Sequence, residues 1–130
     1  MDFQIKLFHW PHRGDHVIAI SRGPLDPEGF KEIFRELDQI TRPMSGCRVV
    51  IDLRDSPCML KSTDVPFLIK DIVENTGPRN NRVALVSAPE VKCSNQLALL
   101  SGCLSNYDFN IAVFTDMNRA ASWLTSASLV

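Results

Sequence analysis

Five short runs of apolar, β-forming residues recur along this chain of 130 residues. They occupy residues 3–9, 16–21, 49–53, 83–86 and 111–114. The last three runs are almost continuously apolar, which is typical of parallel strands that are covered on both faces. Between the first two lies Arg13-Gly14-Asp15, whose turn-forming residues predict a hairpin. The pattern therefore predicts a mixed sheet in which most strands are parallel.

Between these runs, apolar residues recur with the period of an α-helix. The clearest helix follows Asp26, which can cap its first turn, and Pro27 suits the first helical position. Its apolar side consists of Phe30, Ile33, Phe34, Leu37 and Ile40. We expect this helix to end near Thr41, because Pro43 and Gly46 follow.

Three more helices are predicted further along the chain. One begins around residues 62–64, one is capped by either Ser87 or Ser94, and the last starts at Asp116. Their inward sides comprise Val65, Leu68, Ile69, Ile72 and Val73, then Leu97, Leu100, Cys103 and Leu104, and finally Met117, Ala120, Ala121, Trp123 and Leu124. The resulting order, ββαβαβαβα, predicts an α/β fold with a mixed, mostly parallel five-stranded sheet, an N-terminal hairpin and four helices. We expect one domain over residues 1–130, with 126–130 as a loose tail.

The predicted connections leave one face of the sheet in need of a cover. Right-handed crossovers between neighbouring parallel strands would place the connecting helices on the same face. The opposite face then requires a twin subunit, another partner, or a cover formed by the hairpin and a displaced helix, because a large bare apolar face is unusual in a monomer. Self-association as a homodimer is therefore one hypothesis.

Composition and charge exclude several classes of protein. With 45% hydrophobic and 22% charged residues, the chain resembles an ordinary globular domain, so intrinsic disorder is not expected. The net charge of −1, from 14 basic and 15 acidic residues, argues against a nucleic-acid partner. No apolar run approaches the roughly 20 residues of a membrane span, and the first ten residues do not resemble a signal peptide. We therefore expect a cytoplasmic protein with no membrane partner.

The four cysteines are Cys47, Cys58, Cys93 and Cys103, and no pair has the Cys-x-x-Cys spacing. In a cytoplasmic chain of this size, such cysteines are usually free and partly buried. We predict neither a disulfide framework nor a zinc site.

The segment from Cys47 to Asp64 joins a buried strand to a helix start that carries Ser62 and Thr63. Backbone N–H groups point outward at a helix N-terminus, so a hydroxyl there can bind or receive phosphate. The same residue types are also the usual N-caps of helices. Ser62 and Thr63 are therefore either phosphoacceptor or partner-contact residues, or ordinary caps, and capping alone explains their chemistry.

All three histidines, His9, His12 and His16, lie in the predicted hairpin next to Asp15. We expect His9 and His16 to face one another across the strands, with His12 at the tip. A zinc site needs about four ligands in fixed geometry, and a fourth ligand is missing. An exposed polar turn is the favoured interpretation, with no metal and no cofactor.

A second group of side chains follows the carboxyl ends of the strands, where open parallel sheets usually bind ligands. Its members are Arg54, Asp55, Ser56, Cys58, Cys93 and Ser94, which could rim a shared ligand or partner site. A cysteine nucleophile would need a histidine base, and the histidines lie at the opposite end of the chain. We therefore predict no catalytic residues, and we interpret Arg54, Asp55 and Asp52 as a solvated ion-pair loop.

Three segments together resemble the STAS superfamily, specifically its SpoIIAA-like branch. The first is the helix 30–40 followed by the strand 47–54, the second is the strand 81–86, and the third is Val113-Phe114-Thr115-Asp116 leading to Ala-Ala-Ser-Trp-Leu at 120–124. With the hairpin, the resemblance covers nearly the whole chain. These residues are mostly core positions, so they are moderately specific for the fold and weakly specific for function.

The resemblance implies a non-enzymatic regulatory module that binds proteins, similar to the bacterial anti-sigma-factor antagonists. In that family a serine at the helix start is phosphorylated, and Ser62 is the matching residue. Lys61 and Asp64 depart from the acidic residue and the glycine of the family pattern, which argues against phosphorylation. The resemblance also implies an alternative, a small hydrophobic ligand or lipid held in a pocket between sheet and helices.

Overall fold

The computed structural model describes residues 2–10, 14–44, 46–76, 81–88 and 94–126. The strands are β1 (Asp2–Trp10), β2 (Gly14–Arg22), β3 (Arg48–Asp55), β4 (Arg82–Val86) and β5 (Asn110–Phe114). The α-helices are α1 (Pro27–Thr41), α2 (Val65–Asn75), α3 (Ser94–Ser105) and α4 (Met117–Thr125), and a 3₁₀ turn, η1 (Ser62–Asp64), precedes α2. The expected loose tail lies almost entirely outside the described residues.

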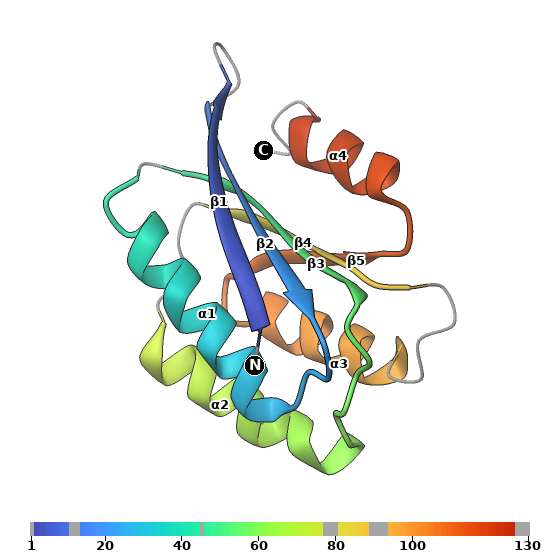
Figure 1. Ribbon diagram of the computed structural model, residues 1–130. Coiled ribbons are helices and arrows are strands. Elements are labelled where there is room, and N and C mark those ends of the chain that lie inside the picture. Colours follow the sequence, from blue (N-terminus) through green and yellow to red (C-terminus); the bar gives the residue numbers. More distant parts are fainter. Residues whose placement is uncertain (1, 11–13, 45, 77–80, 89–93, 127–130) are drawn as a thin grey trace.

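The strands form one sheet in sequence order from β1 to β5 (Figure 1). β1 pairs with β2 as an antiparallel hairpin, and β2, β3, β4 and β5 are parallel. The register between β2 and β3 shifts between Ile20 and Arg22. The α/β class, the mostly parallel sheet and the four helices are as the sequence pattern predicts.

Helices cover both faces of the sheet, because α4 lies on the face opposite α1, α2 and α3 (Figure 1). The three connecting helices share one face, as right-handed crossovers require. α4 follows the last strand, so no crossover constrains it, and it packs against β4, β5 and β3. The sequence analysis allowed several covers for that face, and over β3, β4 and β5 the structure shows one of them, a displaced helix.

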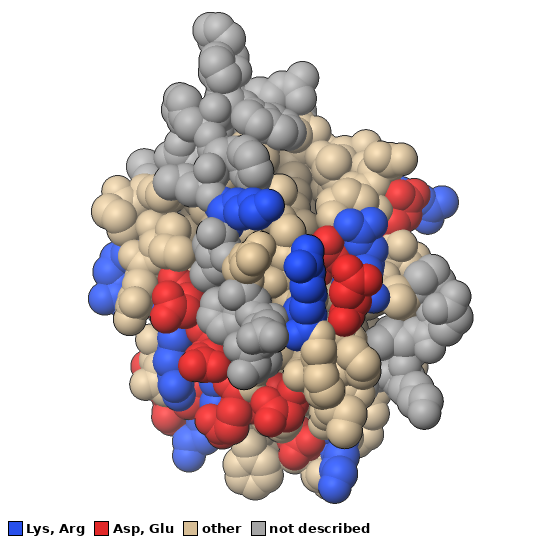
Figure 2. Space-filling model, in the orientation of Figure 1, with Lys and Arg blue, Asp and Glu red and all other residues tan. Residues whose placement is uncertain are grey.

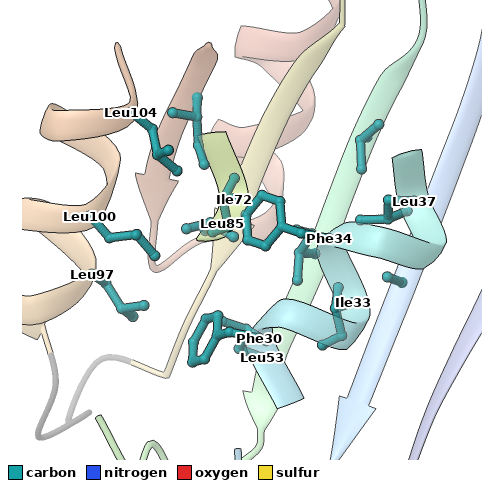
Figure 3. Packing of buried hydrophobic residues seen from close by; sticks show 14 of the residues in the cluster. Phe30, Ile33, Phe34, Leu37, Leu53, Ile72, Leu85, Leu97, Leu100 and Leu104 are labelled. Carbon is teal, nitrogen blue, oxygen red and sulfur yellow. The ribbon is translucent and has the colours of Figure 1, made fainter. Parts of the chain in front are cut away.

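The larger of the two apolar clusters lies between the sheet and α1–α3 (Figure 3). Phe30 and Ile33 of α1, Ile72 of α2 and Leu85 of β4 are each at most 1% exposed. Burial of one such side chain contributes about 1.5–3 kcal/mol. The smaller cluster joins α4 to the sheet through Ala120 and Leu124, with Trp123 packed against it. Ala121, predicted to face inward, is exposed.

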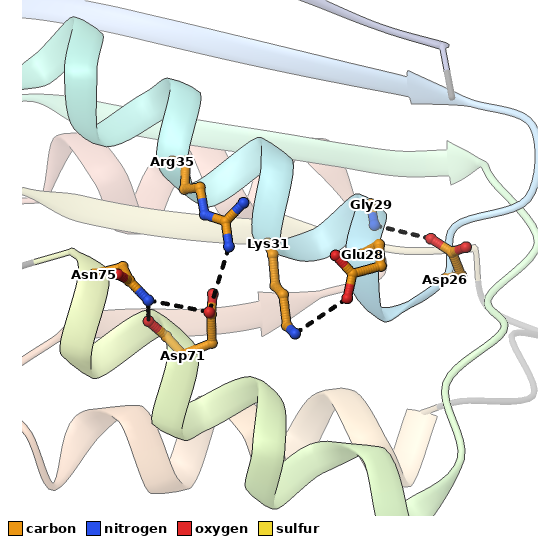
Figure 4. A network of polar contacts seen from close by, with 7 residues as sticks. All are labelled: Asp26, Glu28, Gly29, Lys31, Arg35, Asp71 and Asn75. Atoms are coloured by element: carbon orange, nitrogen blue, oxygen red, sulfur yellow. Dashed lines mark hydrogen bonds and ion pairs between the residues drawn. The ribbon is translucent and has the colours of Figure 1, made fainter.

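α1 begins and ends as its sequence predicts. The Asp26 carboxylate accepts a hydrogen bond from the backbone N–H of Gly29 at 2.8 Å, and Pro27 occupies the first turn. On the outside, Arg35 reaches Asp71 of α2 at 3.4 Å, which ties the two helices together (Figure 4). Figure 2 shows acidic side chains gathered in the lower part of the face that it draws, and Glu32 and Glu36 are exposed acidic positions of α1.

Two arginines from the sheet hold the C-terminal end of α4. Arg48 Nε donates to the carbonyl of Leu124 at 2.7 Å, and Arg82 donates to the carbonyl of Trp123 at 2.8 Å. The Arg82 guanidinium also lies 5.8 Å from the centroid of the Trp123 ring. The last carbonyls of a helix lack intrahelical partners and carry partial negative charge, so cations are favourable there.

Candidate functional site

The loop after β3 is joined to the loop after β2 by a ladder of backbone hydrogen bonds. Leu25 N donates to Pro57 O and Met59 N donates to Leu25 O, both at 2.9 Å. Beneath them, the Ser56 hydroxyl donates to the Ser21 hydroxyl at 2.7 Å, and both side chains are buried. Ser56 is therefore a structural residue and does not line a surface rim, contrary to the sequence-based expectation.

At the end of β3, Arg54 and Asp52 form a two-pronged ion pair. Arg54 Nε and a terminal nitrogen each donate to one carboxylate oxygen of Asp52 at 2.9 Å, and the Arg54 backbone N–H donates at 3.1 Å. Partial burial by itself raises the pKa of Asp52, but the hydrogen bonds and charge of Arg54 outweigh it, so the pKa lies below its ordinary value. The predicted ion pair is present, and Asp55 beside it is exposed.

Ser62 and Thr63 lie in η1, one turn before α2, and both are exposed. The cap of this turn comes from Asp64, whose carboxylate accepts from the Lys61 backbone N–H at 2.8 Å. Within the described residues, neither hydroxyl makes a hydrogen bond. The prediction that Ser62 or Thr63 caps the helix is therefore wrong, because α2 starts later, at Val65, and Asp64 holds the turn.

Two exposed apolar side chains flank this turn. Met59, before it, is 56% exposed, and Phe67, in the first turn of α2, is 73% exposed. Sequence reasoning did not single out either residue. The available signal was that Phe67 falls outside the apolar stripe of its helix, formed by Val65, Leu68 and Ile72, and so lies on the polar side.

The sequence predicted that all four cysteines are free, and the structure contradicts this for one of them. Cys47 and Cys103 form no disulfide, but Cys58 is disulfide-bonded. The prediction fails for Cys58 because disulfide pairing depends on proximity in the fold, and sequence spacing carries no signal for it. Cys93 lies outside the described residues. Ser94 is exposed as the first residue of α3, so the helix does not begin at Ser87, whose N–H instead donates to Phe114 O.

The hairpin does not bring the histidines together as expected. Its register pairs His9 with Asp15 and Phe8 with His16. The register therefore does not set His9 opposite His16. His12 lies outside the described residues. Across the part of the chain that is described, no three His, Cys, Asp or Glu residues are grouped to hold a metal.

A cavity of about 50 Å³ lies at the opposite edge of the sheet, where the parallel strands begin. Its apolar lining comes from Phe34, Leu37, Val49, Val83 and Phe109. Around it, the Thr41 hydroxyl donates to Leu37 O, the Thr76 hydroxyl donates to Ile72 O, and Asn81 bonds Thr41. These polar groups are thus already bonded within the chain. A water needs about 10–15 Å³ of such space and a drug-sized ligand 300 Å³ or more, so only a very small ligand fits.

A second, larger hollow of about 220 Å³ is an open groove beside α2. It is lined by Pro66, Ile69, Lys70, Val73 and Glu74 of α2 and by Tyr107, which follows α3. Neither hollow lies among the side chains predicted to rim a shared pocket. Neither of these two hollows therefore lies at the carboxyl edge of the sheet.

The fold is similar to that of a solved structure. An uncharacterized protein of the DUF3478 family from Shewanella loihica PV-4, with a SpoIIAA-like fold, is 14% identical and superposes with a TM-score of 0.52 over 94% of this chain and 93% of that one. No protein-family model and no curated protein matches the sequence. The chain thus has a SpoIIAA-like fold, as the sequence resemblance implied. No helix among the described residues is long and apolar enough to cross a membrane.

Proposed function

We propose that this domain is a non-enzymatic regulatory module that binds a protein, through the turn at Ser62 and Thr63 and the start of α2. The observation that carries the proposal is the pairing of two exposed hydroxyls with two exposed apolar side chains, Met59 and Phe67. A large apolar side chain exposed at more than half of its surface gains free energy when a partner covers it. Hydroxyls without an internal hydrogen bond can bond that partner at no cost to the fold.

The internal hydrogen bonds of this turn support the proposal. The Lys61–Asp64 bond closes the turn, and the preceding loop is tied to the β2–α1 loop through Leu25. A preorganised surface loses little conformational entropy on binding. Added charge on Ser62 or Thr63 would also fall at the centre of the contact, so phosphorylation at this site would change affinity directly.

Two further features favour a protein partner over nucleic acid or catalysis. Basic and acidic side chains are interspersed on the face shown in Figure 2, without a continuous basic stripe. The buried Ser56 hydroxyl is bonded to another hydroxyl, Ser21, and not to a base that would activate it.

The test is a pair of doubly charged variants compared with the wild type. Ser62→Glu/Thr63→Glu places two charges at the proposed contact, and Ala121→Glu/Ser122→Glu places two on the exposed side of α4. We expect proteins crosslinked to the wild type in the source cell to be retained by the α4 variant and lost by the η1 variant, with both variants folded by circular dichroism. Equal retention by both variants would reject the site.

The alternative function, binding of a small hydrophobic ligand, has one observation in its favour, the apolar lining of the cavity at Phe34 and Phe109. Its volume of about 50 Å³ limits the ligand to a few heavy atoms unless α1 moves. Native mass spectrometry of the purified protein tests this directly. A bound lipid mass would favour the alternative, and loss of that mass in a Val83→Phe variant would place the ligand in this cavity.

We propose a cytoplasmic, bacterial setting for this module, and Cys58 provides its test. Disulfides are rare in the reducing cytoplasm. In that setting the disulfide at Cys58 would be reduced, so the proposal predicts that Cys58 reacts with a thiol reagent added to intact cells before lysis. Labelling of Cys58 only after chemical reduction would place the working protein in an oxidising compartment.

A further inference from the structure

The segment that leads from β3 into η1 carries the disulfide-bonded cysteine of the described chain. Cys58 directly precedes Met59 and lies four residues before Ser62. Burial alternates along this segment, because Cys58 packs against the larger apolar cluster, Met59 is 56% exposed and Leu60 is 5% exposed. The disulfide therefore holds the inner side of a segment whose outer side presents an apolar residue of the proposed contact surface.

The backbone on either side of Cys58 is held by two hydrogen bonds to one residue. Leu25 N donates to Pro57 O and Met59 N donates to Leu25 O, both at 2.9 Å, so that Leu25 and Cys58 form a parallel bridge. The disulfide adds a covalent restraint at the same point. Two backbone hydrogen bonds form and break far more readily than a covalent bond, so opening the disulfide should loosen this segment.

The fold does not depend on a disulfide in the way that small secreted domains do. Those domains lack a sufficient core, whereas this chain of 130 residues buries two apolar clusters. Cys58 is only partly buried, so a small reagent can reach it, while Cys47 is 3% exposed. In the proposed cytoplasmic setting, disulfides that form are usually transient and serve catalysis or redox sensing. A reversible bond at Cys58 fits these properties.

We infer that the disulfide at Cys58 is a redox switch for the proposed contact surface. The oxidised protein holds Met59 and η1 in the binding arrangement, and the reduced protein holds them loosely. This inference rests on the proposed function and names its regulation. Cys47 and Cys103 form no disulfide, so neither supplies the second sulfur. The remaining cysteine of the sequence, Cys93, lies outside the described residues.

The switch moves two electrons and two protons in each direction. A peroxide oxidises two thiols to the disulfide and is itself reduced to two waters. In the reverse step, the thiolate of a dithiol attacks one sulfur of the bond and forms a mixed disulfide. The second thiol of that dithiol then releases the protein as two thiols and leaves as a cyclic disulfide. We expect oxidation to strengthen partner binding about threefold to tenfold, which is the cost of ordering one side chain such as Met59.

Amide hydrogen exchange, measured by NMR on the full chain, tests the mechanical part of the switch. One sample is treated with oxidised glutathione, which spares methionine, and the other with dithiothreitol. We expect the amides of Leu25 and Met59 to exchange at least about tenfold faster after reduction, since a native disulfide typically shifts a folding equilibrium by more than that. The hydrogen-bonded amides of Gly29 and Thr76 are internal references that should not change. Equal exchange of Leu25 and Met59 in both samples overturns the inference.

Two serine variants assign the response to one sulfur. Cys58→Ser cannot form the bond, so Leu25 and Met59 should exchange as in the reduced wild type under both treatments. Cys103→Ser changes a partly exposed cysteine that forms no disulfide, and it should respond as the wild type does. A response that persists in Cys58→Ser, or that disappears in Cys103→Ser, overturns the inference. The reduced wild type gives the same comparison without a substitution, and its thermal unfolding verifies that the fold remains.

Partner capture separates failure of the switch from failure of the proposed function. Oxidised wild type, reduced wild type and the Ser62→Glu/Thr63→Glu variant are crosslinked in parallel. A partner lost in that variant but captured equally by both forms of the wild type keeps the contact surface and rejects the switch. If the amides respond to reduction and the variant still captures the same partner, the contact surface is rejected and only a redox-sensitive loop remains.

Discussion

The C-terminal end of α4 and the N-terminal approach to α2 are both helix ends near the surface, and the chain supplies their partners very differently. Carbonyls at the end of α4 accept hydrogen bonds from Arg48 and Arg82, which reach across from two strands. At the start of α2, the hydroxyls of Ser62 and Thr63 bond nothing else in the described chain, and Phe67 is 73% exposed. The carbonyls at the end of α4 thus find their hydrogen-bond partners within the chain. The hydroxyls before α2 remain available to another molecule.

The difference teaches that exposed polar groups at a helix end are informative only after internal partners have been accounted for. The sequence pattern singled out Ser62 and Thr63 as possible caps and gave Arg48 and Arg82 no role. In the structure the two arginines bond a helix end, and the two hydroxyls cap none. Substitutions on the α4 side should therefore change stability, and substitutions on the α2 side should change association.

The largest loss of stability is expected from Arg82→Met. Its guanidinium donates to Trp123 O and to the Ser126 hydroxyl, at 2.8 and 2.9 Å, and stacks near the Trp123 ring. Hydrogen bonds from a charged donor contribute about 1.5–3 kcal/mol, so we expect a loss of about 2–3 kcal/mol in urea unfolding. Arg119→Met, at an exposed position of the same helix, should stay within about 0.5 kcal/mol of the wild type. Equal losses from both would show that α4 is not anchored through Arg82.

In the turn before α2, loss of the capping carboxylate should lower stability more than loss of the two hydroxyls. Asp64→Ala removes the bond to the Lys61 N–H and should cost about 1 kcal/mol of unfolding free energy, as lost caps do. Ser62→Ala/Thr63→Ala removes no internal hydrogen bond and should cost less than about 0.5 kcal/mol. Urea titration of the three proteins measures both values, and a hydroxyl variant as unstable as Asp64→Ala would restore the capping role that the structure denies.

Acid should weaken the Asp52–Arg54 ion pair in a defined direction. The folded-state pKa of Asp52 lies below its ordinary value of 3.8, so its stabilising contribution is present above that pH and is lost as the pH falls through the lower folded-state pKa. The contribution is on the order of 1 kcal/mol or less, because Arg54 is partly exposed. Between pH 6 and pH 3, the unfolding free energy should therefore decrease less for Asp52→Asn than for the wild type. Parallel losses in the two proteins would contradict this.

The smallest effect on stability is expected from Phe67→Ala, because the side chain is mostly in water already. We expect the unfolding free energy to change by no more than about 0.5 kcal/mol, despite the loss of a large aromatic group. Thermal unfolding of dilute protein, where association does not contribute, is the measurement. A loss of several kcal/mol would mean that Phe67 belongs to the core and not to an interface.

Local patterns predicted most of the fold because each depends on residues close together in the chain. α1 follows from Asp26, Pro27 and an apolar stripe, and the structure confirms all three. The strand runs were found for the same reason, with ends that differ by one or two residues. Arg54–Asp52 was correctly predicted as an ion pair, because the two residues are neighbours in the chain.

Several of the errors involve choices between partners that the sequence makes equally available. Asp64, Ser62 and Thr63 are all suitable caps, and the carboxylate took the position. Ser56 resembled a rim residue until Ser21, 35 positions earlier, proved to be its buried partner. The hairpin register, which sets His9 opposite Asp15, depends on a single residue of offset that the turn determines.

The sequence by itself determined the class of fold, the order of its elements and the buried faces of its helices, because hydrophobic periodicity and caps act over a few residues. Only the tertiary structure decided that α4 crosses to the other face, that Cys58 is bonded and that Phe67 remains uncovered. Each of these depends on which distant segments meet, and contacts between segments are set by packing of the whole sheet. The candidate site at α2 belongs to this second group, since a surface is defined by what the rest of the chain leaves exposed.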